Sequence, residues 1–130
     1  MIVYDAGALI AAERNERPML ALHTRMLQRG LRPVVPATVL AQVWRGGPQV
    51  TLSRVLSGCR IAEGFAERDA RRIGAWLARS ETTDVVDAHV VVVAGRCPGG
   101  VVYTEDIGDL RRIADVADQP PEVLPVPRGL

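Results

Sequence analysis

The chain has 130 residues, of which 48% are hydrophobic and 24% charged, a composition that excludes a disordered chain and favours one compact domain over residues 1–130. The formal net charge of +1 excludes a strongly basic molecule, although all 16 basic residues are arginine. The most apolar later run, Ala88 to Gly95, is much too short to cross a bilayer.

Strand-like and helix-like segments alternate along the chain. Short apolar runs predict strands, and apolar residues spaced at three and four predict helices. In chain order we expect strand 2–5, a helix from about residue 6, helix 18–29, strand 34–35, helices 36–44 and 49–56, strand 59–62, helix 66–79, helix 84–94, strand 101–104, helix 108–114 and edge strand 123–126. Strands separated by helices imply an α/β fold, a three-layer α/β/α sandwich with a mainly parallel central sheet.

The least certain of these segments is 84–94. Asp84 is placed to cap a helix, but the valines that follow Asp87 also have high strand propensity. We expect a helix here because the cap precedes the run.

Two cysteines, Cys59 and Cys97, lie far apart and match no zinc-binding spacing, so we expect buried free thiols. The N-terminus has no basic segment followed by an apolar stretch, which argues against a signal peptide. These features predict a cytoplasmic protein without a membrane anchor. His23 is expected at the surface, and Trp44 and Trp76 are expected to pack in the core or at a subunit interface.

Aspartates follow two of the predicted strands. Asp5 ends the first strand, and Asp106 follows the late one. Because the carboxyl ends of parallel strands meet at one edge of a sheet, these carboxylates should converge. Asp87 lies near the start of a helix, and Asp109 lies one turn beyond Asp106. Clustered carboxylates repel one another unless a cation neutralises them, and oxygen ligands suit Mg²⁺ or Mn²⁺.

Other architectures that use this sheet edge fit less well. A dinucleotide-binding fold needs GxGxxG after the first strand, where this chain has one glycine, Gly7. A phosphate-accepting receiver domain would bring a lysine, and the chain has none. An aspartate-nucleophile phosphatase would have a second aspartate where Gly7 stands.

At these residues the chain resembles the PIN-domain nucleases and, among them, the VapC-type toxin ribonucleases of bacterial toxin–antitoxin pairs. The resemblance extends over nearly the whole chain and rests on four segments: IVYDAGALI from residue 2, VVPATVLAQV from residue 34, DAHVVVVA from residue 87 and VYTEDIGDL from residue 102.

The resemblance implies a Mg²⁺- or Mn²⁺-dependent endoribonuclease that hydrolyses RNA phosphodiester bonds. Carried over by position, the family's acids fall on Asp5, Asp87 and Asp106, and its hydroxyl position beside the last acid falls on Thr104. Asp84 is a further candidate metal ligand, with Asp109 as a supporting residue. Activation of water by the metal would need no histidine or lysine.

The family's usual glutamate in the third helix falls on Gln42, which retains an oxygen ligand but loses the charge. Asp84 could supply the missing charge, since it precedes Asp87 by three residues. An alternative therefore stays open: a PIN-fold module with weak or no catalysis that binds RNA or an antitoxin.

The resemblance also implies partners, namely an RNA substrate, a cognate antitoxin and a second copy in a homodimer. Arg45, Arg111 and Arg112 are the candidate phosphate-binding residues. The helix faces that carry Trp44, or Leu20, Leu22, Met26 and Leu27, are candidate protein contacts.

Overall fold

The computed structural model describes residues 1–129 of the protein. In these residues, five parallel strands form a central sheet. Their spatial order is β3-β2-β1-β4-β5, and every neighbouring pair is parallel. The predicted α/β/α sandwich is confirmed. The strands are β1 (Ile2–Tyr4), β2 (Val34–Pro36), β3 (Arg60–Ala62), β4 (Val101–Thr104) and β5 (Glu122–Pro125).

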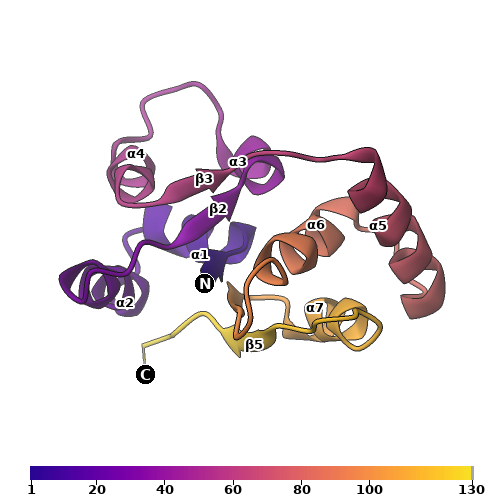
Figure 1. Ribbon diagram of the computed structural model, residues 1–130. Coiled ribbons are helices and arrows are strands. Elements are labelled where there is room, and N and C mark those ends of the chain that lie inside the picture. Colours follow the sequence, from indigo (N-terminus) through magenta and orange to yellow (C-terminus); the bar gives the residue numbers. More distant parts are fainter. Residues whose placement is uncertain (130) are drawn as a thin grey trace.

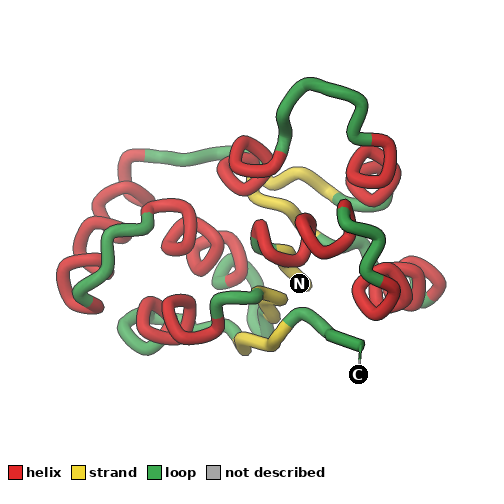
Figure 2. Tube along the Cα trace, turned by 180° about the vertical axis from the view of Figure 1, so that it is seen from behind, coloured by secondary structure: helices red, strands yellow, loops and turns green. Residues whose placement is uncertain are grey.

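The helices cover both faces of this sheet (Figures 1 and 2). One layer contains α1, α2 and α4, and the other contains α6 and α7 with α5 packed outside α6. The strands β1, β2 and β3 follow one another toward one edge of the sheet, and the chain then crosses back to place β4 on the other side of β1. β1 and β4 are therefore neighbours in the middle of the sheet. The helices are α1 (Ala6–Glu13), α2 (Arg17–Gln28), α3 (Ala37–Val43), α4 (Val50–Ser57), α5 (Glu67–Ser80), α6 (Val85–Ala94) and α7 (Ile107–Ala114).

The valine-rich segment 85–94 is a helix, as predicted. Every residue of α6 from Asp87 to Ala94 is buried. This helix lies between the sheet and helices α5 and α7, which explains why it is hydrophobic on all sides. Burial and the Asp84 cap together outweigh the strand propensity of the valines.

The structure corrects two predictions about single side chains. His23 was predicted at the surface but is only 6% exposed, because it faces inward from α2 and its Nδ1 lies 2.9 Å from the hydroxyl of Tyr4. Cys97 was predicted to be buried but is exposed, since it lies in the turn after α6. Cys59 is a buried free thiol, as expected.

Within residues 1–129, no helix combines the length and hydrophobicity that crossing a membrane requires.

Candidate metal centre

Asp5 stands at the carboxyl edge of the sheet, directly after β1. Its backbone N–H donates to Tyr103 of the neighbouring strand β4, which holds the two strand ends together. The carboxylate is 5% exposed and accepts from the backbone N–H of Ala6 at 2.7 Å and from the hydroxyl of Thr104 at 2.9 Å. Asp5 therefore caps α1 and connects the first strand to the late one.

Thr104, at the end of β4, is fully buried. Its hydroxyl donates to Asp5 and accepts from the backbone N–H of Asp106 at 2.9 Å. The predicted hydroxyl position thus links two of the predicted acids through one side chain. This arrangement fixes the turn that leads into α7.

Asp106 is the N-cap of α7, and its Oδ1 accepts from the backbone N–H of Asp109 at 3.4 Å. Asp84 has the same relation to α6, because its carboxylate accepts from the backbone N–H of Asp87 at 3.0 Å. Both helices therefore begin beside the sheet edge with a capping acid and a second acid in their first turn.

Three carboxylates meet at this edge. Oxygen atoms of Asp87, Asp106 and Asp109 all lie within 4.8 Å of one another. Asp87 is buried, whereas Asp106 and Asp109 are exposed, so the group has one buried side and one side open to solvent. This acidic triad could hold a metal ion, because it offers oxygen ligands from two different helices.

Neighbouring carboxylates raise the pKa values of two members of the triad, Asp87 and Asp109. Burial, together with the charges of Asp5, Asp84, Asp106 and Asp109, raises the pKa of Asp87 to about 7. Burial also raises the pKa of Asp5, although its two hydrogen bonds oppose this effect. A hydrogen bond with Asp106 and the charge of Asp106 raise the pKa of Asp109. A divalent cation would relieve this repulsion, so the donor set fits such an ion.

The predicted acids and the predicted hydroxyl residue take three different positions in this site. The structure brings Asp87, Asp106 and Asp109 together and places Asp5 and Thr104 behind them. Asp84 caps α6 at the rim and lies outside the group of oxygens within 4.8 Å. Asp109, predicted as a supporting residue, is a full member of the triad.

Gln42 is exposed near the end of α3. Among the described residues, no hydrogen bond joins the side chain of Gln42 to the acids. The backbone carbonyl oxygen of Gln42 accepts from the guanidinium of Arg45 at 2.6 Å. The side chain of Arg45 also donates to the carbonyl of Trp44, so two backbone groups already hold its guanidinium. Arg111 and Arg112 are exposed in the last turn of α7, and the charge of Arg112 opposes the raised pKa of Asp109.

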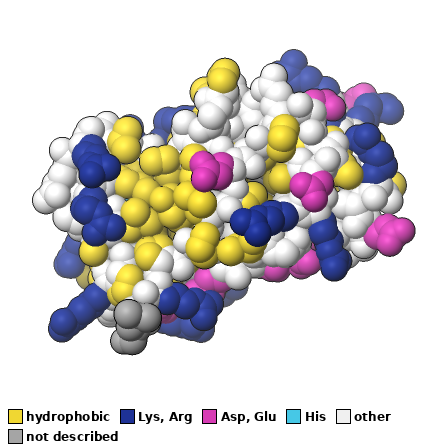
Figure 3. All heavy atoms as spheres, turned by 90° about the horizontal axis from the view of Figure 1, so that it is seen from below, with side chains coloured by type: hydrophobic (Ala, Val, Ile, Leu, Met, Phe, Trp, Pro, Cys, Tyr) yellow, Lys and Arg dark blue, Asp and Glu magenta, His cyan; other side chains and the backbone are white. Residues whose placement is uncertain are grey.

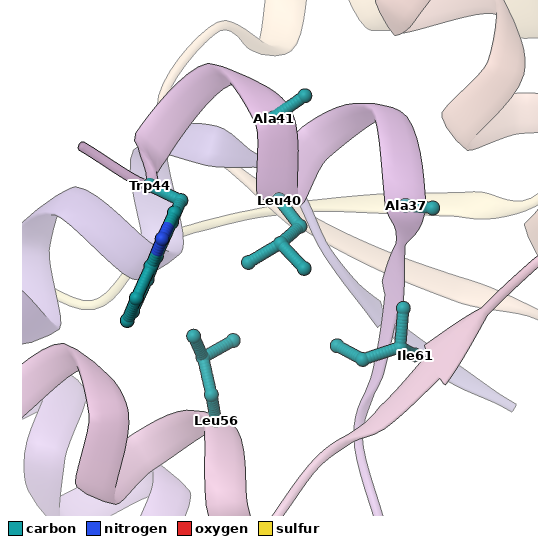
Figure 4. Close-up of a pocket in the computed structure, with 6 residues that line it drawn as sticks. All are labelled: Ala37, Leu40, Ala41, Trp44, Leu56 and Ile61. Carbon is teal, nitrogen blue, oxygen red and sulfur yellow. The ribbon is translucent and has the colours of Figure 1, made fainter. Parts of the chain in front are cut away.

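An apolar hollow of about 440 Å³ lies apart from the acids, between α3, α4 and the edge strand β3. The side chains of Leu40, Trp44, Leu56 and Ile61 point into it (Figure 4). Trp44 is 43% exposed, so the core-packing alternative for this residue is wrong. A second hydrophobic area, bordered by arginines, covers part of the face seen from below in the half of the molecule that holds α2 (Figure 3).

A comparison with models of protein families found no match, and a search of curated proteins found no significantly similar sequence.

Proposed function

We propose that the protein is a metal-dependent endoribonuclease of the PIN type, with the acidic triad as its active centre. The observation that carries the proposal is the convergence of Asp87, Asp106 and Asp109 within 4.8 Å beside buried Asp5. So many carboxylates at one sheet edge are costly unless a cation binds there. The resemblance to VapC-type toxins in the order and spacing of these residues supports RNA as the substrate.

In this proposal the triad holds Mg²⁺ or Mn²⁺. A bound cation would supply Lewis-acid polarisation of the phosphodiester and a lowered pKa for an attacking water. The chain itself supplies position and charge. Asp87, Asp106 and Asp109 would bind the ion, Thr104 keeps Asp106 in place through its backbone N–H, and Asp5 fixes Thr104. With a pKa of about 7, Asp87 would release a proton when the ion binds near neutral pH.

The direct test is cleavage of total cellular RNA by the purified protein. Cleavage should require Mg²⁺ or Mn²⁺, stop in a chelator, and be lost in Asp5→Asn and Asp106→Asn. Asp118→Asn is the matched control, since Asp118 is an exposed acid outside the triad. Cleavage that persists at the wild-type rate in both site variants would contradict the assignment. Mapping the cut positions would identify the preferred RNA sequence.

The second candidate is a PIN-fold module that binds RNA or an antitoxin with weak or no turnover. The specific observation behind it is Gln42, which has an amide where the nucleases that the chain resembles usually have a glutamate. Isothermal titration with Mn²⁺ can decide whether that charge matters. If Asp84 compensates, Gln42→Glu should tighten binding and Asp84→Asn should weaken it; no change from either substitution would eliminate the compensation.

We also propose that the partners are those of a VapC-type toxin, namely a cognate antitoxin and a second copy of the chain. The hollow of Leu40, Trp44, Leu56 and Ile61 supports a protein contact, because it leaves a tryptophan 43% exposed. Light scattering of the wild type and of Trp44→Ser would test the homodimer. A monomer at all concentrations would refute it.

A further inference from the structure

A second pocket of about 440 Å³ lies on the outer side of α6, between that helix and the start of α5. Three arginines reach it, Arg68 and Arg72 from α5 and Arg96 from the turn after α6. Phe65 also lines the pocket and is 44% exposed. Neither the predicted metal ligands nor the predicted phosphate-binding arginines belong to this pocket.

The arginines of this pocket have no carboxylate partner. The one ion pair within residues 1–129 joins Arg71 to Glu67, and neither of these residues lines the pocket. One acid, Asp69, does line the pocket, but it is 7% exposed and caps α5 by accepting from the backbone N–H of Ala66 at 3.0 Å. Three positive charges therefore face one buried negative charge, and the pocket favours an anion.

Two of the guanidinium groups are held in place before any ligand arrives. Arg72 lies over the ring of Trp76, 5.0 Å from its centroid. Arg96 donates to the carbonyl oxygens of Glu63 and Gly64 at 3.5 and 3.2 Å. Each guanidinium has five donors, so both retain free N–H groups for a phosphate. Less side-chain entropy is lost on binding when the groups are already ordered.

Phe65 provides an aromatic surface beside these charges. Its ring packs edge-on against the buried ring of His89, with centroids 5.0 Å apart, and this contact fixes the orientation of Phe65. His89 is two residues after Asp87 on α6, so the two side chains leave this helix on different faces, and the aromatic surface and the acidic triad lie on different sides of α6. Along the helix axis, Asp87 and the pocket residue Val92 are about 7.5 Å apart.

We infer that the pocket formed by Phe65, Arg68, Arg72 and Arg96 binds one nucleotide of a single-stranded RNA. The arginines take its phosphate and Phe65 stacks on its base. Arginine together with an exposed aromatic ring is the combination by which proteins hold single strands without reading their sequence. The inference rests on the proposed function in taking RNA as the ligand.

The test is fluorescence anisotropy of a labelled single-stranded oligoribonucleotide in a chelator, which removes metal-dependent cleavage from the measurement. Arg68→Gln should lower the slope of log affinity against log salt by about one, because one phosphate contact is lost. Phe65→Leu should weaken binding roughly fivefold to tenfold with the slope unchanged, because stacking is lost but no charge is. Arg29→Gln, at an exposed position after α2, is the matched control and should bind like the wild type.

Three results would overturn the inference: no RNA binding by the wild type, binding by Phe65→Leu and Arg68→Gln equal to that of Arg29→Gln, or displacement of the RNA by an acidic peptide as effectively as by unlabelled RNA. Arg72→Lys adds a second readout, because it keeps the charge and should restore most of the affinity lost in Arg72→Gln. Thermal unfolding of each variant verifies that the fold is intact.

Cleavage assays separate this inference from the proposed function. If wild-type cleavage requires Mn²⁺ but the pocket variants bind RNA normally, the inference about the pocket is refuted and the proposed nuclease function is supported. If the pocket variants lose RNA binding as expected but no metal-dependent cleavage occurs, the proposed nuclease function is refuted and the inference about the RNA-binding pocket is supported.

Discussion

Asp87 is a carboxyl group whose charge the fold disfavours, since burial and four neighbouring acids raise its pKa to about 7. The unfolded chain lacks these causes, so its Asp87 titrates near 3.8. The folded protein therefore holds this proton more tightly, and stability decreases as pH rises from about 4 through 7.

We therefore expect Asp87→Asn to raise the melting temperature in a chelator at pH 8, on the order of 5 °C, because the amide relieves the repulsion. Most of the gain should be absent near pH 4, because Asp87 is protonated there in the folded protein and roughly half protonated in the unfolded chain. Calorimetry at the two pH values would check this, with Asp118→Asn as the unaffected control. Equal melting temperatures at pH 8 would show that the triad is not under electrostatic strain.

His23 shifts stability in the opposite direction. Burial lowers its pKa, although the backbone of Val55 opposes this effect. The unfolded chain takes up a proton below about pH 6.5 while the folded protein resists it, so stability is lost as the pH falls. Urea unfolding should therefore show the wild type losing stability relative to His23→Gln between pH 7 and 5. A difference that stays constant over this range would refute the prediction.

At the scale of elements, Gly100 sets the approach of α6 to β4. A Cβ at this position would overlap the carbonyl oxygen of Ala94, which is a backbone atom at the end of α6 and cannot move aside. We expect Gly100→Ala to lower the free energy of unfolding by about 2 kcal/mol or more. Chemical denaturation would measure this change.

Gly74 provides the matched control for that substitution. It lies in α5 with no atom within 4 Å of an added Cβ, so Gly74→Ala should stabilise the helix by about 0.5–1 kcal/mol. Similar losses in both variants would mean that the overlap at Gly100 is not the cause.

The elements were largely predictable because each has a local cause. Gly30, with φ of 74°, follows the end of α2, and Asp84 caps α6. The convergence of Asp5 with Asp106 followed from the parallel order of the strands.

The burial of His23 and the exposure of Phe65 were not predictable, because both depend on which helix face meets the sheet or a neighbouring helix. The arginine pocket was missed for the same reason: Arg68 and Arg72 look like a solvated helix face until the turn after α6 brings Arg96 beside them.

For the whole molecule, a cation that binds the folded triad but not the unfolded chain must raise the melting temperature. At a Mn²⁺ concentration about 100 times the Kd, the added stability is roughly 2.7 kcal/mol. We expect a melting temperature that increases with Mn²⁺ concentration in the wild type and in Asp118→Asn. Asp106→Asn should lose most of the increase. A wild-type melting temperature that is unchanged at millimolar Mn²⁺ would remove the basis for a metal centre.

The hydrogen bond between Thr104 and Asp5 joins residues that are 99 positions apart. A chain still being synthesised therefore has its first acid long before it has the residues that complete the centre. β4 and α7 must leave the ribosome before Asp106 and Asp109 can reach Asp87, since domains fold from the N-terminal side as they emerge. If the protein is a toxic ribonuclease, the ribosome and the messenger RNA on which it is made are protected from the nascent chain until β4 and α7 have emerged.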